Sequence, residues 1–200
     1  MEEHITFKSR PGLIEGRLGR EAPDKGVVIT HPHPLYGGDM DNPVVKAIAK
    51  AFQQKGYTTL RFNFRGVGGS QGSYADGIGE MDDVFAAVSY LTESGTSHLH
   101  LAGYSFGAWI NAGLIVRNPG IEAMVMVSPP VAFIDFKSID SIDCLKLIVT
   151  GSRDDIAPPD RINQLRPKWN PQARFEIIDG ADHFYWGHLG ALQEVVANYV

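Results

Sequence analysis

The sequence predicts an α/β fold: a mostly parallel central sheet, an antiparallel N-terminal hairpin and helices on both faces. From residue 26 onward, short apolar runs of strand length alternate with longer segments of helical period. That alternation is typical of a parallel sheet covered by helices on both faces. Before it, Ile5 to Lys8 and Leu13 to Leu18 alternate in polarity on either side of Pro11 and Gly12. This is the pattern of a hairpin.

The individual elements follow from apolar runs and their turn residues. Strands are expected at Gly26 to Thr30, Thr58 to Phe64, Leu99 to Tyr104, Ala123 to Val127, Leu145 to Thr150 and Arg174 to Ile178. Helices are expected at Pro43 to Lys55, Gly79 to Thr92, Phe106 to Arg117, Pro159 to Leu165 and Leu189 to Tyr199. The stretch 129–144 between two of the strands is too short for an inserted cap, so we expect an open site.

Composition narrows the class of protein. The 200 residues are 44% hydrophobic and 20% charged, which fits one domain over residues 1–200. A net charge of -5 without a long basic run excludes a phosphate-tracking surface, so no nucleic acid partner is expected. The single cysteine, Cys144, leaves no disulfide framework. Neither a signal pattern at the N-terminus nor a membrane-spanning run is visible, so we expect a cytoplasmic protein without a membrane partner.

One pentapeptide carries most of the chemistry. Gly103-Tyr104-Ser105-Phe106-Gly107 directly follows an expected strand and opens an expected helix, the context of a nucleophile elbow. Glycines must flank the serine because a Cβ there would meet neighbouring backbone. Ser105 is therefore the predicted nucleophile, and the backbone amide of Phe106 is a predicted oxyanion donor. A glycine-flanked turn with a capping serine is the alternative.

A serine nucleophile needs a base and an acid that orients the base. His183 lies in a glycine-containing loop between the last expected strand and the last expected helix, where such a base is found. A carboxylate is expected after the preceding strand, and Asp154 and Asp155 both occupy that loop. The chain order serine, aspartate, histidine is the order for a nucleophile elbow.

The loop after the first parallel strand reads His31-Pro32-His33-Pro34-Leu35-Tyr36-Gly37-Gly38. A second oxyanion donor is expected there, and the prolines have no amide hydrogen to offer. The backbone amide of His33 is the first candidate, and that of Leu35 is the second. A metal site is the alternative, because Asp39 and Asp41 follow closely in the sequence.

Two further stretches have competing interpretations. Gly66, Gly68 and Gly72 miss the spacing of a dinucleotide fingerprint, so a bent loop beside the site is the better interpretation. Phe184, Tyr185 and Trp186 follow His183 directly; lining an acyl pocket and packing under the last helix are equally compatible with their position.

With these motifs the sequence resembles the α/β-hydrolase superfamily from Val27 to the end. The histidine-proline stretch, the Met40-Asp41-Asn42 that follows it and the absent cap resemble small, lid-less bacterial serine hydrolases related to dienelactone hydrolases and short-chain esterases. The likeness to their G-x-x-D-x-x-V-P loop favours Asp154 over Asp155 as the acid. One departure is that dienelactone hydrolases carry cysteine where this chain has Ser105.

The resemblance implies a hydrolase acting on ester bonds, either carboxylic esters or thioesters, with a Ser105-Asp154-His183 triad and no cofactor or metal. Its expected partners are a small-molecule acyl substrate and water, and a homodimer remains open. A peptidase, a cofactor-free haloperoxidase and a non-catalytic binding protein are the alternatives on the same fold.

Overall fold

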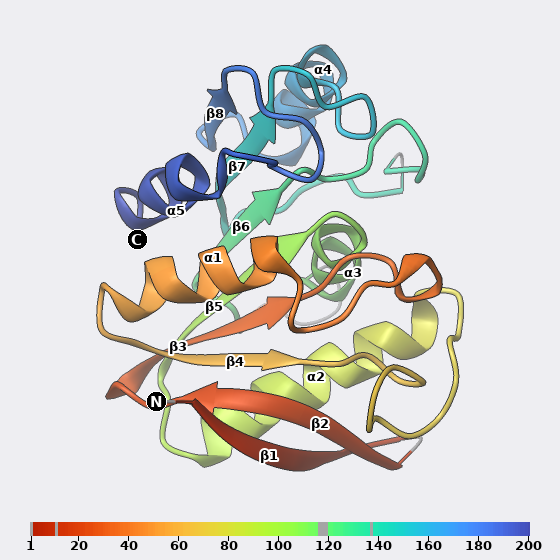
Figure 1. The fold of residues 1–200 in the computed structure, drawn as a ribbon, viewed down its shortest axis with the longest axis vertical. Helices are drawn as coiled ribbons and strands as arrows, with labels where there is room; N and C mark the ends of the chain where they lie inside the picture. The colour runs from red at the N-terminus through yellow and green to blue at the C-terminus, as the bar shows by residue number, and fades with distance from the viewer. Residues whose placement is uncertain (1, 11, 116–119, 137) are drawn as a thin grey trace.

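The computed structural model describes residues 2–10, 12–115, 120–136 and 138–200, and its centre is an eight-stranded sheet (Figure 1). The strands are β1 (Glu2–Ser9), β2 (Gly12–Gly19), β3 (Ala22–Thr30), β4 (Tyr57–Phe62), β5 (His98–Tyr104), β6 (Ala123–Val127), β7 (Leu145–Gly151) and β8 (Arg174–Ile178). The helices are α1 (Pro43–Gln53), α2 (Ile78–Glu93), α3 (Phe106–Ile115), α4 (Pro159–Trp169) and α5 (Leu189–Ala197), with a short 3₁₀ turn at Pro34–Tyr36.

The sheet order is β1-β2-β4-β3-β5-β6-β7-β8. Strand β2 pairs antiparallel with both β1 and β4, and every other neighbouring pair is parallel. In the hairpin Phe7 lies opposite Ile14 and Lys8 opposite Leu13. The predicted fold, an antiparallel hairpin attached to a parallel sheet, is therefore confirmed.

Helices cover both faces of the sheet. α1 and α5 pack on one face, and α2, α3 and α4 pack on the other (Figure 1). Because side chains alternate along a strand, Val27 and Ile29 of β3 enter the core under α1, whereas Val28 enters the core under α2. Both sets are buried, which explains why the strands read as unbroken apolar runs.

Among the described helix ends, that of α4 lies farthest from its predicted position. α4 was expected to stop at Leu165, before a proline, but it continues through Pro167 to Trp169. Trp169 is buried against Phe136, with ring centroids 5.2 Å apart; its burial offsets the backbone hydrogen bond that Pro167 cannot make. The predicted end of α3 at Arg117 lies outside the described residues.

Loops at the carboxyl ends of the parallel strands meet at one edge of the sheet and carry the candidate site. The segment between β6 and β7 forms no cap there, because Phe136, Ile139 and Ile142 turn back into the core. Within the described ranges, no helix is long and apolar enough to cross a membrane.

Candidate active site

Ser105 occupies a strained turn between β5 and α3. Its φ angle is +53°, in the left-handed region that side chains other than glycine rarely enter. The turn is held by the Ser105 amide, which donates to the Val127 carbonyl at 2.9 Å, and by the Ala108 amide, which donates to the Ser105 carbonyl at 2.9 Å. The serine hydroxyl is thereby presented at the carboxyl end of β5.

The glycines of the pentapeptide are required by close backbone contacts. A Cβ on Gly103 would lie 2.6 Å from the Ala108 nitrogen. A Cβ on Gly107 would lie 2.7 Å from the Thr30 carbonyl oxygen and 2.8 Å from that of His31. Larger residues would push α3 away from β3 and β5, so the pattern predicted from the sequence has a local steric cause.

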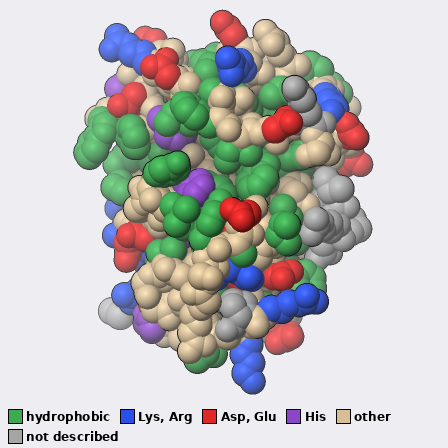
Figure 2. Space-filling view, turned by 90° about the vertical axis from the view of Figure 1, so that its right-hand side faces the viewer, with side chains coloured by type: hydrophobic (Ala, Val, Ile, Leu, Met, Phe, Trp, Pro, Cys, Tyr) green, Lys and Arg blue, Asp and Glu red, His purple; other side chains and the backbone are tan. Residues whose placement is uncertain are grey.

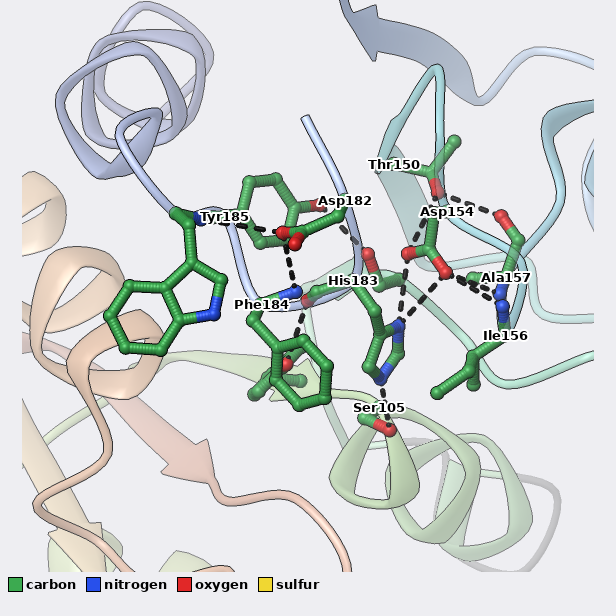
Figure 3. Close-up of polar contacts among 12 residues, drawn as sticks. Ser105, Thr150, Asp154, Ile156, Ala157, Asp182, His183, Phe184 and Tyr185 are labelled. Atoms are coloured by element: carbon green, nitrogen blue, oxygen red, sulfur yellow. Dashed lines mark hydrogen bonds and ion pairs between the residues drawn. The ribbon is translucent and has the colours of Figure 1, made fainter. Parts of the chain in front are cut away.

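The structure brings Ser105, His183 and Asp154 into one hydrogen-bonded chain (Figure 3). His183 Nε2 lies 3.0 Å from Ser105 Oγ. His183 Nδ1 lies 3.0 Å from Asp154 Oδ1 and 2.9 Å from Oδ2. All are largely buried, with Ser105 7%, His183 6% and Asp154 2% exposed. Since a carboxylate only accepts, Nδ1 carries the proton and Nε2 is free to accept one from the serine.

Asp154 is held as a carboxylate by several donors. Its Oδ1 accepts from the amides of Ile156 at 2.9 Å and Ala157 at 2.7 Å, while Thr150 Oγ1 lies 3.4 Å from Oδ2. Burial by itself would raise the pKa of Asp154, but the hydrogen bond and charge of His183 and the Ala157 amide outweigh it, so that the pKa lies below its usual value. The group that faces the imidazole is therefore ionised.

Asp155 has a different environment. Its side chain is exposed, and the helix that follows begins after Pro158 without a side-chain cap. Asp155 therefore does not cap this helix. The structure places Asp154, and not Asp155, against His183.

The loop that carries His183 is anchored on both sides of the imidazole. Tyr104, which is 1% exposed, donates its hydroxyl to the His183 carbonyl at 2.8 Å. Tyr185 is fully buried at a φ of +56° and its hydroxyl lies 2.8 Å from Ser128 Oγ. Ser128 in turn lies within hydrogen-bonding reach of Asp154 and lowers the pKa of that group. The histidine is thus positioned by groups from β5 and from the end of β6.

The side chains next to Tyr185 point the other way. Asp182 Oδ1 accepts the amides of Phe184 at 3.0 Å and Trp186 at 3.3 Å, which fixes a tight turn. Phe184 is 57% and Trp186 75% exposed, whereas Tyr185 has no exposed surface. Of the three consecutive aromatic residues, Tyr185 packs in the core and the other two are exposed, with the Phe184 ring centroid 5.7 Å from that of His183.

In the loop after β3, the two candidate oxyanion amides differ in availability. The Leu35 amide donates to His33 Nδ1 at 3.2 Å and is already used. Among the described residues, neither the His33 amide nor the Phe106 amide has a hydrogen-bond partner. Their side chains are in contact, with ring centroids 4.6 Å apart. The His33 and Phe106 amides, which the sequence favoured as oxyanion donors, are therefore free of hydrogen bonds to the described residues.

His31 braces the same loop from inside. It is fully buried, its Nδ1 donates to the Pro32 carbonyl at 2.7 Å, and its Nε2 accepts the Phe64 amide at 3.0 Å. Both bonds need the neutral ring, and burial lowers the pKa of His31 to about 4. With both nitrogens in use, this histidine has no lone pair for the metal that the sequence left as an alternative.

The loops around the site differ from a metal centre and from a phosphate-binding loop. Within the residues that the structure describes, no group of three or more histidine, cysteine or acidic side chains is placed to hold a metal ion. The glycine-rich loop after β4 surrounds a carboxylate: Glu15 Oε1 accepts the Gly69 amide at 2.7 Å and Asn63 Nδ2 at 2.6 Å. A phosphate would be repelled from a loop whose donors already hold an anion.

Residues 24–188 match the family model described as an alpha/beta hydrolase domain. The chain belongs to the α/β-hydrolase family. An uncharacterized protein of Rickettsia prowazekii is 39% identical over 98% of this chain and 87% of its own length. Among solved structures, an α/β serine hydrolase homologue from Coxiella burnetii is 35% identical, with a TM-score of 0.90 over 98% of this chain and 96% of its own. A serine hydrolase without a lid from Xanthomonas campestris is 27% identical, with a TM-score of 0.91 over 100% and 93% of the chains.

Several residues of this hydrolase site escaped the sequence reasoning. Tyr104, Ser128 and Tyr185 position the base and the acid from three separate segments, and His31 braces the oxyanion loop. Ser128 follows β6 just as Asp154 follows β7, and this position at a strand end is the one signal that could have found it. Nothing in the sequence pairs it with Tyr185.

Proposed function

We propose that this α/β hydrolase cleaves a carboxylic ester or thioester through an acyl-enzyme on Ser105. The observation that carries the proposal is the continuous chain from Ser105 Oγ through His183 to Asp154, with contacts of 2.9 to 3.0 Å. Such a chain in a packed loop activates a serine, because the histidine accepts its proton during attack.

The proposed reaction uses each group in turn. Ser105 attacks the acyl carbonyl while His183 Nε2 takes its proton, and the Phe106 and His33 amides stabilise the oxyanion. His183 then protonates the leaving oxygen or sulfur. Asp154 stays ionised and fixes the imidazole tautomer. Water attacks the acyl-enzyme with His183 again as base, which releases the acid and restores Ser105.

The first experiment is labelling with a fluorophosphonate probe, followed by mass-spectrometric mapping of the modified residue. We expect modification at Ser105, none in Ser105→Ala, and a loss of several powers of ten in ester turnover in that variant. Its stability should change little, because the replacement removes one hydroxyl.

The base is tested with a matched pair of histidines from the same loop. His183→Gln should lose both labelling and turnover, whereas His188→Gln, at a partly exposed position, should keep both. Folded wild-type protein that takes no label would overturn the proposal and favour a non-catalytic binding protein.

A further inference from the structure

Exposed hydrophobic side chains border the candidate site on two opposite sides. Tyr36, 87% exposed, and Leu35, 65% exposed, project from the loop after β3. Phe184 and Trp186 project from the loop after β8, next to His183. Figure 2 looks onto this edge of the sheet and shows hydrophobic side chains gathered around histidines in the middle of the face. These side chains face solvent in the residues that the structure describes, so they are open to a group that binds at Ser105.

On the β3 side the rings form a continuous surface, which we call the aromatic shelf: His33, Tyr36 and Tyr74, with Phe106 beneath. The His33 ring centroid lies 4.8 Å from that of Tyr36, 5.2 Å from that of Tyr74 and 4.6 Å from that of Phe106. The Tyr74 hydroxyl is 3.4 Å from His33 Nε2. The shelf thus adjoins the proposed oxyanion amides, since these belong to His33 and Phe106.

The geometry of the tetrahedral intermediate limits which part of the substrate can contact the shelf. In the tetrahedral intermediate the reacting carbon carries Ser105 Oγ, the oxyanion, the leaving group and the acyl chain. The leaving group must lie on the side of His183 Nε2, which protonates it. That side is bordered by Phe184, whose ring centroid is 5.7 Å from that of His183. The acyl chain is therefore directed away from His183, and we assign it to the shelf, which adjoins the oxyanion amides of His33 and Phe106.

The charge around the shelf selects against acidic acyl groups. The loops at residues 31–39 and 66–77 contain no lysine or arginine, and they contain Asp39 and Asp76. Behind them, the fully buried Glu80 accepts the amides of Ala75 at 2.9 Å and Gly77 at 2.8 Å. A carboxylate on the acyl chain would approach negative charge without a partner cation.

We propose that the aromatic shelf is the acyl subsite and that it accepts an uncharged acyl group that carries an aryl ring. This inference rests on the proposed ester hydrolysis. The shelf rings are tilted by 38 to 52° to one another, so an aryl group meets them in tilted and edge-to-face contacts that add to the area buried. A saturated ring of the same size gains only the buried area.

The test uses 4-nitrophenyl esters that share one leaving group and differ in the acyl chain: 3-phenylpropionate, 3-cyclohexylpropionate and 3-(4-carboxyphenyl)propionate. Cyclohexyl is the more apolar ring, so a surface acting by the hydrophobic effect alone would favour it. We expect kcat/KM for the phenyl ester to exceed that for the cyclohexyl ester by about threefold to tenfold. The carboxylated ester should be the poorest substrate.

Three variants locate the effect. Tyr36→Leu removes the aromatic ring at an exposed position. It should bring the ratio of kcat/KM for the phenyl ester to that for the cyclohexyl ester to one or below. Trp186→Leu, at an exposed position on the loop after β8, should keep the wild-type ratio. Phe133→Leu, whose side chain is 76% exposed on the loop after β6, should leave both the rates and the ratio unchanged.

Each outcome decides something. Hydrolysis of these esters without a phenyl preference, or a preference that disappears in Trp186→Leu but persists in Tyr36→Leu, would overturn the subsite while leaving ester hydrolysis intact. In that case, wild-type protein that cleaves both 4-nitrophenyl acetate and the longer esters would show that the catalytic residues work and that only the proposed subsite is wrong. Protein that cleaves none of them and takes no fluorophosphonate label would overturn the proposed function, and the subsite with it.

Discussion

Asp154 and Asp155 are adjacent in the chain and yet have opposite surroundings. One is 2% exposed and accepts two backbone amides as well as the His183 ring, while the other is exposed. The turn at the end of β7 thus selects one carboxylate by its backbone amides. The amides of Ile156 and Ala157 both donate to Asp154 Oδ1, so they orient the carboxylate independently of the imidazole.

This difference gives a matched pair of variants. Asp154→Asn keeps the shape but offers an amide NH₂ or a neutral oxygen to His183, so the imidazole loses its favoured tautomer and turnover should fall by about four powers of ten. Asp155→Asn should stay within about twofold of wild type. Initial rates with a 4-nitrophenyl ester measure both; equal losses in the two variants would contradict the assignment.

His31 makes stability depend on pH. Its pKa is lowered from 6.5 to about 4 because it is buried and neutral. Between those values the unfolded chain binds more protons than the folded one, so folding stability is fully present above pH 6.5 and is lost as the pH falls toward 4. The loss at the lower limit is roughly 3 kcal/mol.

Urea unfolding at pH 7.0 and pH 4.5 measures this contribution. The decrease in the free energy of unfolding should be smaller in His31→Gln, which cannot titrate, than in wild type. His188→Gln is the control and should keep the wild-type decrease. If His31→Gln shows the full wild-type decrease, the titrating group lies elsewhere.

At the scale of elements, a buried ion pair ties the loop after β4 to α2. Arg65 Nη2 and Asp83 Oδ1 lie 2.9 Å apart, and Asp83 Oδ2 accepts both the Arg65 amide and its Nε at 3.0 Å. Ser9 of β1 donates to the same carboxylate at 2.7 Å. Asp83 has no exposed surface, so it joins the hairpin, the loop and the helix at one point.

Removing one partner of such a pair leaves the other charge buried and unpaired. Asp83→Asn should therefore lower the free energy of unfolding by about 3 to 5 kcal/mol. The adjacent Asp82→Asn, at a partly exposed position, should change it by less than about 0.5 kcal/mol. Chemical denaturation of both variants measures the two changes. A small effect of Asp83→Asn would contradict the view that the Arg65–Asp83 ion pair stabilises the fold.

An element can be predicted from the sequence when residues close to it in the chain determine it, and it cannot when distant contacts determine it. β6 and β8 were predicted with their observed bounds, because turn residues close the apolar runs on both sides. The nucleophile turn was predictable because its motif is contiguous in the sequence and Gly103 meets the backbone of Ala108, although Gly107 meets Thr30 and His31, which are distant in the sequence. The contact of Ser128 with Tyr185 joins residues far apart in sequence, and it depends on the order of β6, β7 and β8 in the sheet. The same holds for Trp169, whose burial extends α4 past a proline.

At the scale of the whole molecule, the fold leaves uncovered the edge of the sheet at which the loops around Ser105 lie. The segment between β6 and β7 packs its apolar side chains into the core, and the loops around Ser105 bear their aromatic residues outward. No rearrangement of a cap is needed before a substrate can reach the serine. This openness bears directly on the kinetics of the proposed reaction.

An uncovered site should show no interfacial activation. As the concentration of a short triacylglycerol such as tributyrin is raised through its solubility limit, the initial rate should follow one saturating curve without a jump. A sharp increase at the limit would indicate that a segment covers the site in solution and opens at an oil surface. Titrimetric assay of released acid measures the rate on both sides of the limit.

Cys144 ends the segment before β7, and its carbonyl accepts the Met124 amide at 2.7 Å. It is the sole cysteine of the chain, and burial raises the pKa of its thiol to about 11. At neutral pH the thiolate needed for alkylation is scarce while β6 and β7 stay paired. Because the thiol is only partly buried, we expect a maleimide to consume it more slowly in the folded protein than in the unfolded chain, and the ratio of the two rates measures the protection that the fold gives.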